Sequence, residues 1–236
     1  MRQIPRLFVE QPLAEGLAVA LEGGPAHYLG TVLRMAAGAT VHLFDNQTGE
    51  WAAAIETVMK RALIVRVGAR LRPRETVPDL WLLSAPIRRE RFEWIVEKAT
   101  ELGVARIVPV LTERTNRDRI KADRLRAHMV EAAEQCERTA LPELADSIAL
   151  KALLADWPTD RALIFADEGG GEPMARLAAK GPAAILIGPE GGFSEGERSM
   201  ILAVQAVKRL SLGPRILRAD TAVVAAIAQF QAFSGT

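Results

Sequence analysis

The sequence predicts an α/β protein in two parts, a small β-barrel or sandwich followed by a larger domain built on a parallel sheet. Up to about residue 75, short and roughly alternating apolar runs are separated by glycine or polar turns, with one helical piece at "PAHYLGTVLR". Beyond that point, apolar strand-like runs alternate with helical stretches, which is typical of a parallel sheet covered on both faces. The stretch "RLRPRETVPD" lies between the two patterns and is the predicted linker. We therefore expect domains at 1–72 and 73–236.

The second domain is expected to begin with the strand "LWLLSA" and to continue with strands at "RIVPV", "ALIFAD", "AILIG" and "RLSLG". Between the first two, "RRERFEWIVEKATELG" predicts an amphipathic helix that ends at Gly103. The apolar stripe of this helix consists of Phe92, Ile95, Val96, Ala99 and Leu102. Lys98 and Glu101 lie on its other face, and we interpret them as a solvent-exposed ion pair rather than as part of a site.

Composition narrows the possible functions. The chain has 236 residues and a formal net charge of +1, with an apolar fraction that is ordinary for a globular protein. A single cysteine, Cys136, excludes an internal disulfide, and the scattered histidines make no metal-ligand spacing, so no metal is expected. No apolar run is long enough to span a membrane, and "MRQIPRLFVE" lacks the apolar core and cleavage site of a signal peptide, so we expect neither feature. A cytoplasmic protein without a membrane partner is the expectation.

The stretch "LIGPEGGFSEGE" predicts a strand, a tight glycine turn and a helix that begins with a capping box of Ser194 and Glu197. Such turns bind ligands in open α/β sheets. The G-x-S-x-G match suggests an esterase, but all three histidines precede Ser194, whereas that fold needs one after the serine. Phosphate-loop and dinucleotide spacings are also absent. Two interpretations stay open: a site for an adenosine-type ligand such as S-adenosylmethionine, or a simple tight turn.

A second glycine turn lies in "RLSLGPRILRADTAVVAAIAQF", which again runs from a strand to a helix. The expected N-cap of that helix is Asp220, and its first turns hold small residues that permit close approach of a ligand or another chain. Arg215 and Arg218 place positive charge at the turn. Alternatively, both arginines are solvated or pair with Asp220.

Besides the two glycine turns, the chain contains "EKATELGVARIVPVLTERT" and "AAEQCER", preceded by "PRLFV", "HYLGTVLR" and "VHLFDNQTGEWAAAI". Together these stretches resemble the RsmE family of SPOUT-class methyltransferases. The resemblance implies a parallel α/β sheet with a C-terminal trefoil knot that binds S-adenosylmethionine, preceded by a PUA-like RNA-binding β-barrel. It also implies a homodimer that methylates N3 of a uridine in 16S ribosomal RNA, within the 30S subunit. Another SPOUT enzyme, acting on a ribose hydroxyl, and a non-catalytic RNA-binding module are the alternatives.

This chain departs from the family pattern at two positions. Asp220 stands where the family usually has Glu, which keeps a carboxylate but shortens its reach. Glu137 stands where the family usually has Gly, and we expect that difference to concern packing at a helix end. A catalytic role for Asp220 is less strongly supported as a result.

The turns and the resemblance together define a candidate site. The expected cofactor-binding residues are Phe165, Ala166, Asp167, Ile187, Gly188, Pro189, Glu190, Gly191, Gly192, Ser211, Leu212, Gly213, Ile216, Leu217, Arg218, Thr221 and Ala222. For catalysis, Arg218 or Arg215 would stabilise the imide anion of uridine, and Glu190 or Asp220 would accept its proton.

Two basic stretches of the sequence are candidates for RNA binding. Residues 60–74 contain six Lys or Arg and no acid, and residues 114–126 contain six against two aspartates. Such stretches bind phosphate or merely keep a surface soluble, and an RNA-binding barrel favours the first interpretation. The residues we expect to contact RNA are Arg6, Arg34, Arg66, Arg70, Arg88, Arg89 and Arg114.

Overall fold

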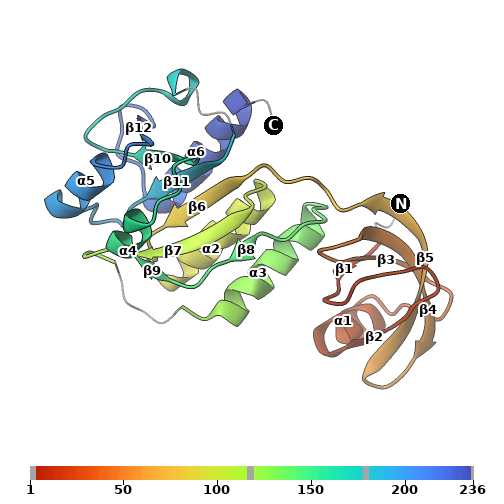
Figure 1. Cartoon of the computed structure of the whole chain (residues 1–236). Coiled ribbons are helices and arrows are strands. Elements are labelled where there is room, and N and C mark those ends of the chain that lie inside the picture. Colours follow the sequence, from red (N-terminus) through yellow and green to blue (C-terminus); the bar gives the residue numbers. More distant parts are fainter. Residues whose placement is uncertain (1–3, 116–119, 178–180, 235–236) are drawn as a thin grey trace. The chain divides into compact units, whose positions relative to one another are not determined.

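The computed structural model describes residues 4–115, 120–177 and 181–234. The chain forms two compact units (Figure 1). The first comprises Met1–Thr76 together with Ala133–Leu141, and the second comprises Val77–Ala132 and Pro142–Thr236. In the described part of the chain, no helix is both long enough and apolar enough to span a bilayer.

The first unit contains a five-stranded sheet in the order β1-β3-β4-β5-β2. Its strands are β1 (Arg6–Phe8), β2 (Ala18–Glu22), β3 (Thr40–Phe44), β4 (Gly49–Val58) and β5 (Ala62–Pro73). β1 pairs with β3 in parallel, and the other pairs are antiparallel. Alternate residues point into one core, where Val65 on β5 lies between Val19 on β2 and Ile55 on β4. This alternation is what the sequence predicts for a half-buried sheet.

The predicted helical piece of this unit is present as two short turns, α1 (Gly23–His27) and η1 (Tyr28–Val32), the second with π-type hydrogen bonding. Leu29 anchors them in the core, whereas Tyr28 and Val32 are exposed. The turns end at Arg34, which has a left-handed backbone with φ +53°. That conformation is unfavourable for a residue with a Cβ, yet it is common just after a helix.

The expected linker begins later than predicted. Arg70, Arg72 and Pro73 belong to the end of β5, where they pair with Trp51, Glu50 and Gly49 on β4. A Cβ at Gly49 would collide with the backbone of Arg72 and Pro73, so only glycine allows this close pairing. Proline is tolerated because it occupies the end of the strand.

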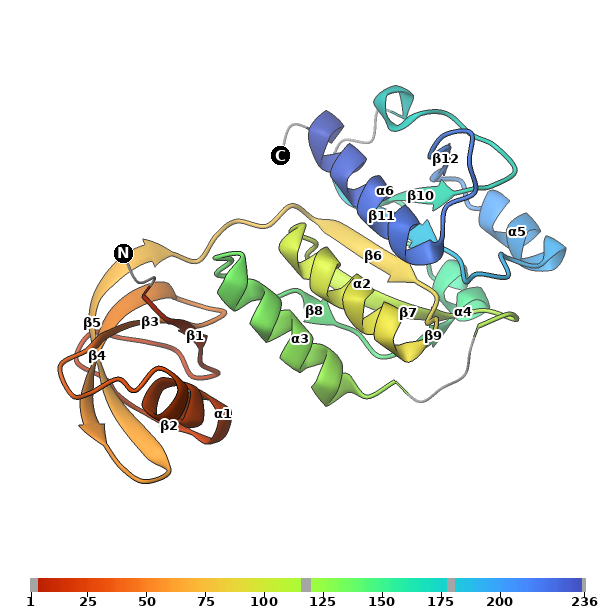
Figure 2. The same ribbon diagram turned by 180° about the vertical axis from the view of Figure 1, so that it is seen from behind.

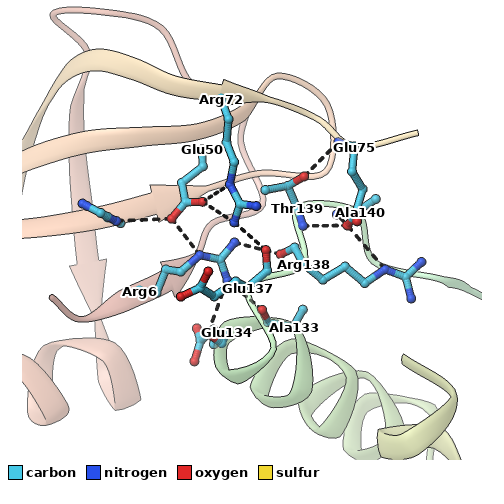
Figure 3. Close-up of polar contacts among 11 residues, drawn as sticks. Arg6, Glu50, Arg72, Glu75, Ala133, Glu134, Glu137, Arg138, Thr139 and Ala140 are labelled. Carbon is cyan, nitrogen blue, oxygen red and sulfur yellow. Dashed lines mark hydrogen bonds and ion pairs between the residues drawn. The ribbon is translucent and has the colours of Figure 1, made fainter. Parts of the chain in front are cut away.

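Residues 133–141 were expected in the second domain but pack with the first unit. Figure 3 shows Arg6 of β1 donating hydrogen bonds to the carbonyls of Ala133 (2.7 Å) and Arg138 (2.8 Å). In the same network, Thr139 donates its N–H to Glu75 at 2.8 Å. Hydrophobic periodicity carries no signal for such backbone contacts, which explains why the sequence did not reveal them.

Glu137, the second departure from the family pattern, has φ +64°. It follows α3 (Ala122–Gln135), in the position where helices commonly end with a left-handed glycine. The family's glycine is therefore explained by backbone conformation rather than by packing, which corrects our expectation. Its carbonyl accepts a hydrogen bond from Arg72 (Figure 3).

The second unit is built on a parallel sheet in the order β12-β10-β11-β6-β7-β8, with β9 also paired to β7. The strands are β6 (Leu80–Ser84), β7 (Arg106–Leu111), β8 (Glu143–Leu144), β9 (Ile148–Ala149), β10 (Ala162–Ala166), β11 (Ala183–Ile187) and β12 (Val207–Leu210). The helices are α2 (Arg89–Glu101), α3 (Ala122–Gln135), α4 (Leu150–Ala155), η2 (Met174–Arg176), α5 (Glu195–Leu202) and α6 (Ala219–Ser234). Every strand pairing described for this sheet is parallel.

Helices cover both faces of this sheet (Figures 1 and 2). Along β11, Ile185 and Ile187 join the core beneath α2, α3 and α6, whereas Ala184 and Leu186 join the core beneath α4 and α5. A strand buried on both faces has no polar side, which is why "AILI" is continuously apolar. The predicted helix over "RRERFEWIVEKATELG" is confirmed as α2, and Lys98 pairs with Glu101 at 2.7 Å.

Candidate functional site: a cavity at the ends of three strands

The loops that follow β10, β11 and β12 meet at one end of the sheet. Because β10 pairs with both β11 and β12 in parallel, the three strands end side by side, with Phe165 opposite Leu186 and Ala166 opposite Leu210. The carboxyl edge of a parallel sheet is where α/β proteins bind ligands. The two glycine turns of the sequence therefore lie at the same edge of the sheet, and the loop after β10 lies between them.

These loops surround a cavity of about 480 Å³. This volume lies in the range of small-molecule sites. The cavity is lined by Phe165, Ala166, Asp167, Glu168, Gly170, Ile187, Gly188, Pro189, Glu190, Gly192, Phe193, Arg198, Ser211, Leu212, Gly213, Pro214, Arg215, Ile216, Leu217, Arg218, Ala219 and Ala222. Nearly all of the expected cofactor-binding residues are among them.

The turn after β11 forms one wall of the cavity. A Cβ at Gly188 would lie 2.7 Å from Cε2 of Phe193, so the close approach of that ring requires glycine. Phe193 in turn packs edge-on against Phe165, with ring centroids 5.4 Å apart. Gly192 has φ +65° and donates its N–H to the carbonyl of Pro189 at 2.9 Å, which closes the turn. The result is an apolar wall with backbone groups at its edge.

The capping box predicted at the start of α5 is present. The Ser194 Oγ accepts from the N–H of Glu197 at 3.2 Å, and the Glu197 carboxylate accepts from the N–H of Ser194 at 3.0 Å. No described histidine lines the cavity. Ser194 is therefore a helix cap rather than a nucleophile.

Asp167 follows β10 and is the most strongly held carboxylate of the site, with its side chain only 2% exposed. It accepts hydrogen bonds from Arg198 and Arg209, each at 2.8 Å, and from the N–H of Gly169 at 2.9 Å. Burial raises the pKa of Asp167, but these hydrogen bonds outweigh burial and hold its pKa below the usual 3.8. Sequence reasoning missed both arginines because they come from α5 and β12, far from Asp167 in the chain.

Replacing Asp167 with Asn is expected to destabilise the protein by about 1–3 kcal/mol at neutral pH, because two arginines lose a charged partner in a buried position. The unfolded state binds a proton near pH 3.8, whereas the folded state does so only at lower pH. The stabilisation is therefore complete above that value and is lost as the pH falls through the lowered folded pKa. Urea unfolding of the unsubstituted protein and of Asp167→Asn from pH 3 to 7 tests this prediction. A difference in their free energies of unfolding that did not shrink in acid would contradict it.

The turn after β12 places Arg215 and Arg218 on the cavity, and both are exposed. Gly213 has φ +110°, a conformation that other residues rarely adopt. Among the described residues, no hydrogen bond or ion pair engages either guanidinium. Both cations therefore line the cavity without an ion-pair partner in the part of the chain that the structure describes.

Asp220 is not the N-cap that was predicted, because α6 already begins at Ala219. Its carboxylate accepts from Arg91 of α2 at 2.5 Å and from the N–H of Thr221 at 2.7 Å. Burial raises the pKa of Asp220, but the bonds from Thr221 and Arg91 outweigh it and leave the pKa below its usual value. The sequence gives no sign of this contact, because Arg91 lies on the polar face of α2, far from Asp220 in the chain.

Two expected cofactor residues do not line the cavity. The Gly191 carbonyl accepts a hydrogen bond from Arg114, and the Thr221 hydroxyl bonds to Asp220 at 3.3 Å. Some lining residues are not among the expected ones. Glu168 and Gly170 lie in the loop after β10, Arg198 lies on α5, and Phe193, Pro214 and Ala219 lie within the two glycine-turn stretches.

All of the expected RNA-binding arginines except Arg6 are exposed. Arg34, Arg88 and Arg89 are exposed. Arg66 is exposed but bound to Glu56, and Arg70 lies 6.0 Å from the ring of Trp51. From the basic stretch at 114–126, Arg117 and Arg119 lie outside the described residues.

Arg6 is the exception, because its side chain is only 8% exposed. Figure 3 shows its guanidinium bound to Glu50 at 2.7 Å as well as to the carbonyls described above. Burial raises the pKa of Glu50, and hydrogen bonds from Arg6 and Arg72 bring that pKa below its usual value. This placement gives Arg6 a structural task and does not favour a phosphate contact.

Comparison with known proteins defines the class first. Residues 74–231 match the RNA methyltransferase domain family, and residues 21–68 match the RNA methyltransferase PUA domain family. The fold is thus the knotted SPOUT class of α/β methyltransferase, preceded by a PUA-like domain.

Individual relatives narrow the assignment. The chain is 31% identical over 230 residues to the ribosomal RNA small subunit methyltransferase E of Rickettsia conorii, covering 95% of this chain and 93% of that protein. It therefore belongs to the ribosomal RNA small subunit methyltransferase E family, RsmE.

Solved structures agree with this assignment. A Legionella pneumophila methyltransferase in complex with bound S-adenosylmethionine superimposes with a TM-score of 0.89 at 30% identity, covering 98% of both chains. The Neisseria gonorrhoeae ribosomal RNA small subunit methyltransferase E bound to S-adenosylmethionine gives 0.87 at 26% identity, again over 98% of both chains.

Proposed function

We propose that this protein transfers a methyl group from S-adenosylmethionine to N3 of a specific uridine in 16S ribosomal RNA. The observation that carries the proposal is the cavity formed by the three loops after β10, β11 and β12, in a chain of the RsmE family. Relatives with the same fold hold S-adenosylmethionine, which supports that cofactor for this chain.

The residues of the cavity fit such a cofactor. S-adenosylmethionine carries no phosphate, and the cavity offers apolar walls from Phe165, Ile187 and Leu212 with backbone groups of the glycine turns at their edges. In the described residues, no group of His, Cys, Asp or Glu is placed to share a metal ion. When bound, the cofactor would supply an electrophilic methyl group on sulfur.

The protein's own contribution is to make uridine N3 a nucleophile and to orient it towards the methyl group of the cofactor. N3 belongs to a weakly acidic imide, so it attacks only after losing its proton, and a nearby cation stabilises the anion that results. Arg218 and Arg215 line the cavity, neither has an ion-pair partner among the described residues, and both suit this role. Alignment of the two reactants in one site contributes further acceleration.

Glu190 is the better candidate for the proton acceptor. It lines the cavity and is exposed. Asp220 has a lowered pKa and is bound by Arg91, so it is a weaker base and less free to approach a substrate. We therefore assign Asp220 to positioning the start of α6 and Glu190 to proton transfer.

RNA capture is assigned to the exposed cations of both units, and Arg34 gives the clearest test. Arg34→Gln is expected to weaken RNA binding and to reduce the slope of log affinity against log salt by about 0.7–0.9, the amount for one lost phosphate contact. Arg66→Gln is the matched control, because Glu56 already pairs with Arg66 at 2.8 Å, and a smaller change is expected. Filter binding across a salt series measures both slopes. An unchanged slope for Arg34→Gln would remove it from the interface.

Assembly and location follow from the same proposal. The homodimer is proposed from the family resemblance, and Ile216, which lines the cavity and is 86% exposed, is a residue that we expect a second copy to cover. The 16S ribosomal RNA substrate, within the 30S subunit, places the enzyme in the cytoplasm.

Mass spectrometry of nucleosides from the ribosomal RNA of a deletion strain is the decisive experiment. Loss of one N3-methyluridine, restored by the plasmid-borne gene, is the expected result. Loss of a ribose methyl group instead would identify a different methyltransferase. Unchanged RNA, together with no calorimetric binding of S-adenosylmethionine, would leave only an RNA-binding module.

A further inference from the structure

The loop after β7 forms a tight turn of its own. The Thr112 N–H donates to the Thr115 hydroxyl at 2.8 Å, and the two threonine hydroxyls lie 2.7 Å apart. Both threonines are buried. These hydrogen bonds close a turn that has Glu113 and Arg114 at its centre.

Both of these residues contact the segment that forms the cavity wall. The Glu113 N–H donates to Oε1 of Glu197 at 2.7 Å, and the other oxygen of Glu197 accepts from Ser194. Glu197 is only 3% exposed, so one buried carboxylate joins the loop to the start of α5. Arg114 Nη1 donates to the Gly191 carbonyl at 2.6 Å.

Arg114 also packs over the turn through its aliphatic stem. A Cβ at Gly191 would lie 3.4 Å from Cδ of Arg114, which is close van der Waals contact. Pro189, Glu190 and Gly192 line the cavity, whereas Gly191 between them does not. Arg114 therefore contacts the turn from outside the cavity, whereas the residues on either side of Gly191 form the cavity wall.

A turn with two consecutive glycines has many accessible backbone conformations when nothing holds it. Ordering it only when a ligand arrives would weaken binding, and a contact that orders it beforehand strengthens binding. We infer that Arg114 is a positioning residue that holds the 188–192 turn in its cofactor-binding conformation. This inference rests on the proposed function of the cavity, and it replaces the expectation that Arg114 contacts RNA phosphate.

The test is calorimetric titration of S-adenosylmethionine into the full chain without RNA. Arg114→Met keeps the aliphatic stem but removes the donor, and it is expected to weaken cofactor affinity about tenfold, as for a lost charge-assisted hydrogen bond. Arg114→Lys is expected to recover part of that loss, since an ammonium donates to a carbonyl but lacks the planar fork. Methyl transfer should show a raised KM for S-adenosylmethionine with little change in kcat.

Arg176→Met is the matched control, because Arg176 is a surface arginine that pairs with Glu172 at 3.3 Å and does not line the cavity. It should bind the cofactor normally. Unchanged cofactor affinity in Arg114→Met, with RNA affinity lowered, would overturn the inference and make Arg114 a phosphate contact. Equal losses of cofactor affinity in Arg114→Met and Arg114→Lys, each with a lowered Tm, would also overturn the inference. Failure of the unsubstituted chain to bind S-adenosylmethionine would instead overturn the proposed function itself.

Discussion

Arg218→Ala is expected to lower single-turnover methyl transfer, at saturating RNA and cofactor, by on the order of a hundredfold. That is the usual loss when a donor aimed at developing charge is removed. Arg218 lines the cavity directly before α6, and no described carboxylate neutralises it. Arg218→Lys should restore only part of the rate, because one ammonium cannot reproduce the planar guanidinium. Raising the pH should partly rescue the alanine variant, since the imide then ionises with less help.

The exposed position of Arg218 means that the alanine variant should fold normally, so Tm serves as its control. Arg215→Ala is the informative comparison, because Arg215 lines the same cavity from the same loop. A variant of Arg218 that bound RNA more weakly but kept its single-turnover rate would make Arg218 a phosphate contact. The stabilising cation would then be Arg215.

Gly213→Val is expected to abolish measurable binding of S-adenosylmethionine. Gly213 lines the cavity with φ +110°, so a branched side chain both strains the turn and occupies space beside the ligand. Isothermal titration with the purified, folded variant measures the effect. Retained affinity would show that the cofactor lies away from the loop after β12.

Gly38→Val separates backbone strain from loss of the pocket. Gly38 also has positive φ, +85°, and open space where a Cβ would be, but it belongs to the first unit. Both variants should lose some stability, whereas only Gly213→Val should lose cofactor binding. A similar loss in both would mean that the effect of Gly213→Val comes from general destabilisation.

Local patterns predicted those elements whose residues are neighbours in the chain. Apolar periodicity identified α2, and the pair of Ser194 and Glu197 identified the start of α5, because each signal lies within a few residues. The two glycine turns indicated the cavity, since the ends of parallel strands meet at one edge. The sequence resemblance, rather than periodicity, supplied the cofactor and the knot.

Contacts between distant residues could not be predicted in this way. Arg198 and Arg209 meet at Asp167 only because α5 and β12 fold back beside β10. Arg6 appeared available for RNA in the sequence, but its guanidinium is occupied by Glu50 and by backbone carbonyls of residues 133–138. The basic character of a stretch does not show how many of its cations are already engaged inside the fold.

The discontinuous first unit has a consequence for how the chain is made. Its sheet is complete at Pro73, yet the segment Ala133–Leu141 that bonds to Arg6, Arg72 and Glu75 is synthesised only after residues 77–132. While the chain is still growing, Arg6 can pair with Glu50. The backbone carbonyls of 133–138 that later accept hydrogen bonds from Arg6 and Arg72 have not yet been made. The N-terminal unit therefore reaches its final stability late in translation, and no single cut in the gene separates the two units intact.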